Sequence, residues 1–313
     1  MTTTWYRRGL GLLFFGLCLL TALPVPAQPP GRFFLTGSGQ LNLINHRNDR
    51  QAKVELLNSD GTINEEALTR VDWVFGYPTS KYNDHMSLRM LFMLSYFADM
   101  AAPGQVIHIE SGYRSPEYNK AIRQQGANAA RTSTHIDGMA LDFWLAGVDG
   151  KELWETVRAR DCCGVGHYGG KTIHLDAGRP RFWEAATSGT GSTEPDNNRH
   201  IYLNTTYDRY QPGEKLSLML SGISSFSFGV ENEVTLHPAV HPETVAARLP
   251  LHSAPKDRCL PIGDRETSRS LTAALPPSLP AGRYTVEVAF CQKPFKEMPE
   301  KAISRTIEVV ATP

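Results

Sequence analysis

A segment of small polar residues, TSGTGSTEPDNN at positions 187–198, divides this chain of 313 residues into two parts with different sequence patterns. The segment is rich in Gly, Ser, Thr and Asn and has no apolar period, which is typical of a linker. A chain of this length can bury two separate hydrophobic cores. We therefore expect one domain over residues 28–186 and a second domain over residues 199–313.

Before the linker, helical and strand-like patterns alternate, which predicts a mixed α+β domain. The stretch from Ser115 to Gly126 combines a capping serine, a proline at the first helical position and a terminal glycine, and these signals bound a helix. The other expected elements are helices over 64–74, 85–101 and 151–160, and strands over 40–45, 52–57, 105–110, 139–145 and 171–176.

After the linker, short apolar runs such as KLSLMLS and RYTVEVAFC are separated by Pro/Gly turns such as Gln211-Pro212-Gly213. Short alternating runs between turn signals are typical of a small all-β, sandwich-like domain. The pattern carries no signal for the role of this domain, so its protein partner stays unknown.

The N-terminus has the layout of a secretory signal. Arg7 and Arg8 precede the apolar run GLGLLFFGLCLLTAL, and VPA at 25–27 offers a small residue for cleavage after Ala27. The run is short for a spanning helix, so we expect no permanent membrane span in the mature chain. The paired arginines leave both general secretion and twin-arginine export open. We expect an exported, periplasmic or otherwise extracytoplasmic protein.

Four cysteines remain after the expected cleavage. In an oxidising compartment, Cys259 and Cys291 are expected to form a disulfide within the second domain. The adjacent Cys162 and Cys163 are compatible with two buried thiols, with a vicinal disulfide, or with bonds to the other two cysteines.

The charge balance bears on partners. The chain has 32 basic and 32 acidic residues, so its formal net charge is zero. A nucleic-acid-binding chain needs an excess of basic residues, and we therefore expect no nucleic-acid partner.

The stretch STHIDGMALD at 133–142 places His135 and Asp142 seven positions apart around Gly138, which allows the chain to bend. Strand alternation puts Asp142 on one face of the strand over 139–145, and His174 and Asp176 on one face of the strand over 171–176. Two histidines and one carboxylate on facing strands make a tetrahedral zinc site with one open position, as hydrolytic zinc requires.

This stretch resembles the first zinc motif of the peptidoglycan-cleaving metallopeptidases, which include D-Ala-D-Ala carboxypeptidases and VanX-type dipeptidases. The hedgehog signalling domain shares their fold. With SGYRSPEYN at 111–119, GVGHY at 164–168 and IHLD at 173–176, the chain more specifically resembles the MepK family of exported murein endopeptidases. The resemblance covers roughly residues 38–185 and implies a hedgehog/DD-peptidase-like zinc peptidase domain.

The resemblance also implies roles for single residues. His135, Asp142 and His174 match the ligands of one zinc ion per chain. Arg114 matches an arginine that holds the substrate carbonyl, a role that suits a preorganised donor to developing oxyanion charge. Tyr168 is a candidate donor to the tetrahedral intermediate.

The general base stays open. VanX-type members carry a glutamate three residues before the last histidine ligand, where this chain has Lys171. Asp176 is therefore either the catalytic base or a group that supports a metal ligand. The nearby His167, and also His85 and His108, are expected not to be ligands.

The implied function is zinc-assisted hydrolysis of an amide in a peptidoglycan stem peptide or cross-link, by a murein endopeptidase or a carboxypeptidase. One alternative is a zinc-containing, non-catalytic cell-wall binding or signalling module of the same fold. A second is a non-haem iron dioxygenase built on His174-x-Asp176 and a later histidine at 200, 237 or 241.

Overall fold

The computed structural model describes residue 1 and residues 31–311, apart from 83, 189, 191–193 and 253–258. The expected secretory signal and its cleavage after Ala27 lie outside the described residues. Gly31–Pro313 form one compact unit, and the division into domains at the linker stays a prediction. Among the described residues, no helix combines the length and the apolar character that a membrane span needs.

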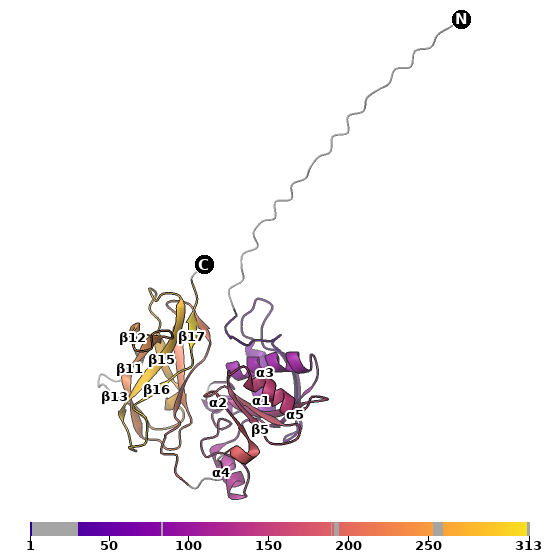
Figure 1. Cartoon of the computed structure of the whole chain (residues 1–313), viewed down its shortest axis with the longest axis horizontal. Helices are drawn as coiled ribbons and strands as arrows, with labels where there is room; N and C mark the ends of the chain where they lie inside the picture. The colour runs from indigo at the N-terminus through magenta and orange to yellow at the C-terminus, as the bar shows by residue number, and fades with distance from the viewer. Residues whose placement is uncertain (2–30, 83, 189, 191–193, 253–258, 312–313) are drawn as a thin grey trace. The chain divides into compact units, whose positions relative to one another are not determined.

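The first part of this unit is a seven-stranded mixed sheet covered by helices (Figure 1), which confirms the mixed α+β class. The strand order is β2-β1-β3-β4-β6-β5-β7, with β1 parallel to β3, β5 parallel to β7 and all other pairs antiparallel. The strands are β1 Gln40–Asn45, β2 Arg50–Glu55, β3 Ile107–Ser111, β4 Ala140–Leu145, β5 Gly164–His167, β6 Ile173–Asp176 and β7 Arg181–Glu184. The helices are α1 Glu65–Phe75, α2 Thr79–Tyr82, α3 Leu88–Ala101, α4 Pro116–Gln124 and α5 Gly150–Arg158, followed by a 3-10 turn at Ala185–Thr187.

Local signals explain where these helices begin. Ser115 accepts a hydrogen bond from the Tyr118 backbone N–H at 3.1 Å, and Pro116 takes the first helical position, as predicted for α4. The helix predicted over 85–101 begins only at Leu88, because Ser87 caps it by accepting from Met90 N. The short elements α2, β5 and β7 were not predicted, since four residues are too few to show a period.

Helix α3 packs against β4 and β6, the strands that carry Asp142 and His174. Most of its apolar side chains are buried in a common core with the sheet. Such a close-packed core resists displacement, so β4 and β6 form a rigid base for the side chains on their other face.

The second part of the unit is built from strands, with one 3-10 turn at Thr267–Arg269. One sheet has the order β14-β10-β8, and the other has the order β12-β11-β15-β17-β9, with β13 beside β11 and β16 beside β15. The strands are β8 Tyr202–Thr205, β9 Arg209–Tyr210, β10 Lys215–Ser221, β11 Phe228–Pro238, β12 Ala247–Pro250, β13 Cys259–Ile262, β14 Leu271–Ala274, β15 Gly282–Gln292, β16 Lys301–Ile303 and β17 Ile307–Val309. The predicted β-rich character is confirmed, whereas a separate sandwich domain stays a prediction.

A buried ion pair joins the two parts. The Arg89 guanidinium of α3 donates to Asp208 at 2.7 Å, to the Thr205 hydroxyl at 2.9 Å and to the Tyr207 carbonyl at 2.9 Å. Removing one partner of such a buried pair typically costs about 3–5 kcal/mol, because the other charge is left uncompensated. The β-rich part is thereby fastened to the helix behind the sheet.

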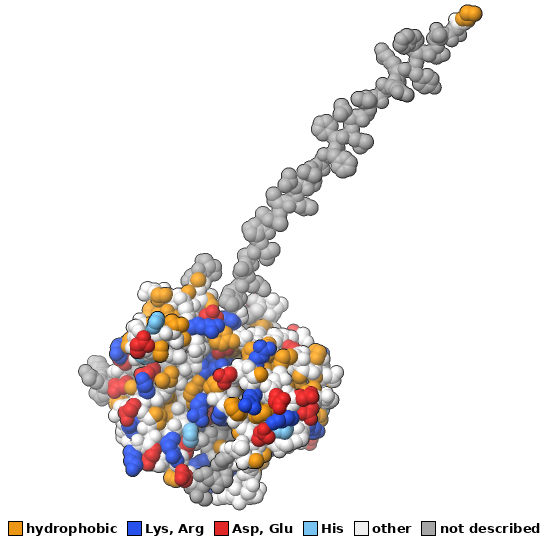
Figure 2. Space-filling view, in the orientation of Figure 1, with side chains coloured by type: hydrophobic (Ala, Val, Ile, Leu, Met, Phe, Trp, Pro, Cys, Tyr) orange, Lys and Arg blue, Asp and Glu red, His pale blue; other side chains and the backbone are white. Residues whose placement is uncertain are grey.

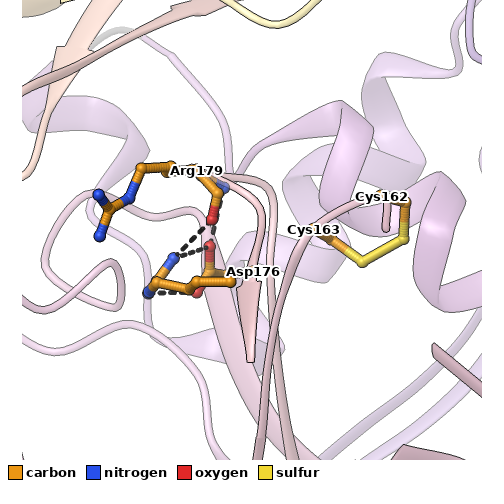
Figure 3. The surroundings of a disulfide bond; sticks show 6 residues. Cys162, Cys163, Asp176 and Arg179 are labelled. Carbon is orange, nitrogen blue, oxygen red and sulfur yellow. Dashed lines mark hydrogen bonds and ion pairs between the residues drawn. A yellow bond between two sulfur atoms is a disulfide. The ribbon is translucent and has the colours of Figure 1, made fainter. Parts of the chain in front are cut away.

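Both cysteine pairs are bonded. The predicted disulfide between Cys259 and Cys291 is confirmed, and it links β13 to β15. Cys162 and Cys163 form a vicinal disulfide (Figure 3), which selects one of the three arrangements compatible with the sequence. Basic and acidic side chains are interspersed on the face shown in Figure 2 and do not gather in one patch there.

Candidate metal centre

Strand pairing brings the candidate ligands together. Asp142 of β4 and His174 of β6 are direct partners in the antiparallel ladder, so both side chains stand on the same face of the sheet. His135 lies in the loop that enters β4. This loop bends at Gly138, whose φ of 67° is left-handed, and a Cβ there would lie 2.5 Å from the Tyr77 ring. The bend expected at Gly138 is therefore present. Its left-handed backbone and the close Tyr77 ring both require a residue without a side chain.

The three facing atoms have the spacing of a tetrahedral metal site. His135 Nε2 lies 3.2 Å from His174 Nδ1 and 3.3 Å from Asp142 Oδ1, and His174 Nδ1 lies 3.0 Å from the same oxygen. A tetrahedral ion with bonds of about 2.0–2.1 Å separates its ligand atoms by about 3.3 Å. The three residues are buried, with exposed fractions of 1% for His135, 5% for Asp142 and 3% for His174. The residues present thus fit a small divalent ion.

The outer hydrogen bonds of the two histidines direct their lone pairs inward. His135 Nδ1 lies 2.7 Å from the Gly112 carbonyl oxygen, which only accepts, so this nitrogen carries the hydrogen. His174 Nε2 likewise donates to Asp176 at 2.8 Å. When both rings are neutral, two nitrogen lone pairs and an Asp142 oxygen face one another. Three acceptors this close repel unless a cation lies among them.

The charges of the cluster also favour a cation. Burial raises the pKa of the Asp142 carboxyl, but the nearby His135 and His174 outweigh it and hold that pKa well below its ordinary value. Burial lowers the pKa of His174, while hydrogen bonds to the carboxylates of Asp142 and Asp176 raise it more. Asp142 is therefore an anionic ligand at neutral pH, and the rings are held beside negative charge.

Asp176 is fully buried behind His174, with an exposed fraction of 0%. Its Oδ1 accepts from Gly178 N at 2.8 Å and from Arg181 Nη1 at 3.1 Å. Its Oδ2 accepts from Arg181 Nη2 at 2.7 Å and from His174 Nε2 at 2.8 Å. Burial raises the pKa of this carboxyl, but the Arg181 charge and the His174 contact lower it well below the ordinary value. Both oxygens of the Asp176 carboxylate are thus hydrogen-bonded, chiefly to Arg181 and to the outer nitrogen of His174.

Arg114 and Tyr168 adjoin the third ligand. Arg114 Nη2 donates to Asp142 Oδ2 at 2.5 Å, and its Nε donates to Ser111 Oγ at 2.9 Å. Burial raises the pKa of the Tyr168 hydroxyl, and the Asp142 carboxylate, to which it is hydrogen-bonded, raises it further. The phenol therefore stays protonated at neutral pH, and its one O–H is donated to Asp142.

Two clefts meet at Arg114 and Tyr168, which line both. The first cleft, of about 370 Å³, contains His135 and His174. The second contains Asp142 and lies against Tyr118 of α4. Both clefts therefore reach the candidate metal centre, the first at His135 and His174 and the second at Asp142.

The β-rich part holds the loop that carries His135. The Arg265 guanidinium pairs with the Asp137 carboxylate, which also accepts from Gly222 N at 3.2 Å. Arg269 Nη2 donates to the Asp137 carbonyl at 3.1 Å. These contacts link residues 85 or more positions apart, so the sequence carried no signal for them.

Within the described part of the chain, no other group of three His, Cys, Asp or Glu residues has metal-ligand spacing. His85, His108 and His167 lie outside the cluster. His174 and Asp176 contact each other directly, and none of the three later histidines completes a metal group with them. The arrangement needed for the iron dioxygenase alternative is thus not formed by these residues.

Some contacts at the centre were not predicted. Arg181 and the Gly112 carbonyl hold the outer sides of the ligands, and the Trp183 ring lies 5.0 Å from the His174 ring. Arg181 and Trp183 belong to β7, a strand too short to be recognised. A backbone carbonyl leaves no signal in a sequence.

Comparison with known proteins agrees with this geometry. Residues 36–183 match the family model Peptidase_M15_2, described as peptidoglycan L,D-endopeptidase MepK. Peptidoglycan L,D-endopeptidase MepK of Escherichia coli (strain K12) is 28% identical over 146 residues, which are 46% of this chain and 79% of the relative. The probable peptidoglycan L,D-endopeptidase MepK of Haemophilus influenzae is 37% identical over 79 residues, which are 25% of this chain and 42% of the relative. The resemblance to peptidoglycan metallopeptidases of the MepK family is confirmed.

Proposed function

We propose that this chain, whose residues 36–183 resemble peptidoglycan L,D-endopeptidases, is an exported zinc peptidase that hydrolyses an amide bond in the peptide part of peptidoglycan. The observation that carries the proposal is the spacing of His135, Asp142 and His174 at 3.0–3.3 Å with inward-facing lone pairs. An N,N,O set without thiolate suits a catalytic zinc with an open position. The two disulfides suit a periplasmic or otherwise extracytoplasmic protein.

His135, Asp142 and His174 would hold one zinc ion per chain. Bound zinc supplies a Lewis acid that polarises a carbonyl group and lowers the pKa of a water molecule to ~7. Gly112 and Asp176 keep the two imidazole rings in the tautomers that metal binding needs, through hydrogen bonds of 2.7 and 2.8 Å. Arg114 and Tyr168, which line both clefts, adjoin the candidate ligand Asp142.

Arg114 is proposed to bind the carbonyl oxygen of the scissile amide as negative charge develops on it, and Tyr168 joins it when its single O–H turns from Asp142 to that oxygen. Two N–H groups of Arg114 bond Ser111 and Asp142, and a guanidinium has five such donors. Its position is therefore set by the protein while donors remain for a substrate. Preorganised donors of this kind stabilise the transition state, because no reorganisation is needed when the charge appears.

Of the two roles left open for Asp176, the contacts favour support of His174. A base must reach the open side of the metal, whereas this carboxylate meets the outer nitrogen of His174 and the Arg181 guanidinium. We propose that Asp176 orients the ring and strengthens it as a ligand.

Asp176→Asn is expected to lower zinc affinity about 10–100-fold, because one of its acceptor oxygens becomes an amide that cannot accept from both His174 and Arg181. Hydrolysis should recover substantially at saturating zinc. Chelator competition measures the affinity, and the same change at the exposed Asp161 is the control. Unchanged zinc affinity with loss of most of the rate would instead identify Asp176 as the base.

The two clefts favour an endopeptidase over a carboxypeptidase, since a cross-linked peptide extends on both sides of the scissile bond. The test is incubation of the mature, zinc-loaded chain with purified cross-linked muropeptides and mass spectrometry of the products. Two peptide fragments identify an endopeptidase, and their masses identify the bond. Release of a single terminal amino acid would overturn this part of the proposal.

A further inference from the structure

The cleft beside His174 has an unbalanced charge. Among the described residues that line it are three arginines, Arg114, Arg179 and Arg181, and none is an aspartate or glutamate. His200 also lines it and is paired with Asp196 at 2.5 Å. Any ligand of this cleft therefore meets a positively charged wall next to the candidate metal centre.

Only one of the three arginines is without an acidic partner among the described residues. Arg114 pairs with Asp142 at 2.5 Å, and Arg181 pairs with Asp176 at 2.7 Å. The Arg179 side chain is exposed, and its guanidinium points away from Asp176 (Figure 3). This guanidinium is free to meet an anionic group of a ligand.

A hydrogen-bond donor without a partner lies in the same cleft. The Thr134 side chain has an exposed fraction of 7%, and its hydroxyl has no hydrogen-bond partner among the described residues. Its methyl group lies 3.3 Å from the position that a Cβ on Gly178 would take, directly before Arg179. Buried hydroxyls are normally hydrogen-bonded. The Thr134 hydroxyl therefore indicates a donor that is kept for a group bound in the cleft.

The β-rich part also contributes to the cleft, where Tyr202, Ser221 and Gly222 line it. Burial raises the pKa of the Tyr202 hydroxyl to about 12, and the nearby Arg179 charge only partly opposes this. The phenol is therefore neutral and does not compensate the Arg179 charge.

We propose that Arg179 and Thr134 form a carboxylate-binding subsite that selects peptides with a free carboxylate near the scissile amide. A guanidinium can bind a carboxylate with two parallel hydrogen bonds, and the threonine hydroxyl adds a third donor. The inference rests on the proposed function and names the chemistry of its substrate. Arg179 is a specificity-determining residue in this account and takes no part in holding the metal.

The test compares two stem-type peptides that differ only in one group, a free carboxylate or the corresponding carboxamide. Their backbone amides are N-methylated to resist hydrolysis, and binding to the zinc-loaded mature chain is measured by calorimetry. Arg179→Gln should weaken binding of the carboxylate peptide about 10–100-fold, as expected for a hydrogen bond to a charged group, and leave the carboxamide peptide within about threefold. Arg131→Gln, the same change at an exposed arginine that lines neither cleft, is the matched control.

Thr134→Val keeps the packed methyl group and removes the hydroxyl, so it should weaken carboxylate binding about two- to tenfold while the fold is retained. The inference is overturned when Arg179→Gln preserves the carboxylate preference of the wild-type chain. It is also overturned when wild type shows no such preference for any carboxylate position. Binding does not depend on turnover. If the wild-type chain hydrolyses no peptide but prefers the carboxylate peptide, and Arg179→Gln loses that preference, the proposed function is rejected and the subsite is retained.

Discussion

Replacing His174 by alanine is expected to leave the purified protein without stoichiometric zinc and without peptidase activity. The change removes one of three ligands and leaves the others, His135 and Asp142, with too few donors for tight binding. The loss of affinity should exceed the 10–100-fold that removal of an outer hydrogen-bond partner costs. His135→Ala should behave in the same way, and metal analysis after dialysis measures both.

His167→Ala is the matched control for this prediction, because His167 pairs with Ile173 in the sheet and lies outside the group of three ligands. Its ring nitrogen hydrogen-bonds the Gly170 carbonyl at 3.1 Å. This variant should keep about one zinc per chain. Circular dichroism of all variants with chelator present separates metal loss from unfolding. Full zinc retention in both His135→Ala and His174→Ala would refute the ligand assignment.

Arg114→Ala is expected to lower kcat about 10²–10³-fold while zinc stays bound. The guanidinium is a charged donor that contacts the candidate ligand Asp142 and lines both clefts, and loss of one such donor to a developing oxyanion typically has this effect. Asp142 keeps its metal contact, so zinc content should change little. Steady-state kinetics on a cross-linked muropeptide, with metal analysis of the same sample, give both quantities.

Arg47→Ala is the control for Arg114, since Arg47 lines the neighbouring cleft and donates to Ser111 at 3.4 Å. It acts on Asp142 through its charge, whereas Arg114 also donates a hydrogen bond to that ligand. Its kcat should stay within a few-fold of wild type. An Arg114→Ala protein with normal kcat and a raised KM would show that this residue binds substrate without stabilising the transition state.

The arrangement of the candidate ligands could be predicted in part from the sequence. Strand alternation placed Asp142 and His174 on the faces that they occupy, and Gly138 indicated the bend that returns His135 to them. The register that makes Asp142 and His174 direct partners depends on the whole sheet. No local pattern specifies it.

The role of Asp176 could not be decided from the sequence, because it depends on what its carboxylate contacts. The sequence placed Asp176 and His174 on one strand face, which is compatible with a base and with a supporting group. The contact with Arg181 distinguishes the two, and Arg181 lies on the unrecognised strand β7. Contacts from the β-rich part, such as Arg265 with Asp137, join distant positions that only folding brings together.

The central claim is that the mature chain cleaves peptidoglycan peptides with the aid of a metal held by His135, Asp142 and His174. The most direct measurement is the release of fragments from purified peptidoglycan by the chain after chelation and again after one equivalent of zinc is restored. We predict no release from the metal-free protein and restored release with zinc. Release unaffected by chelation would contradict the metal centre. No release by a folded chain that carries one zinc would favour the non-catalytic binding module.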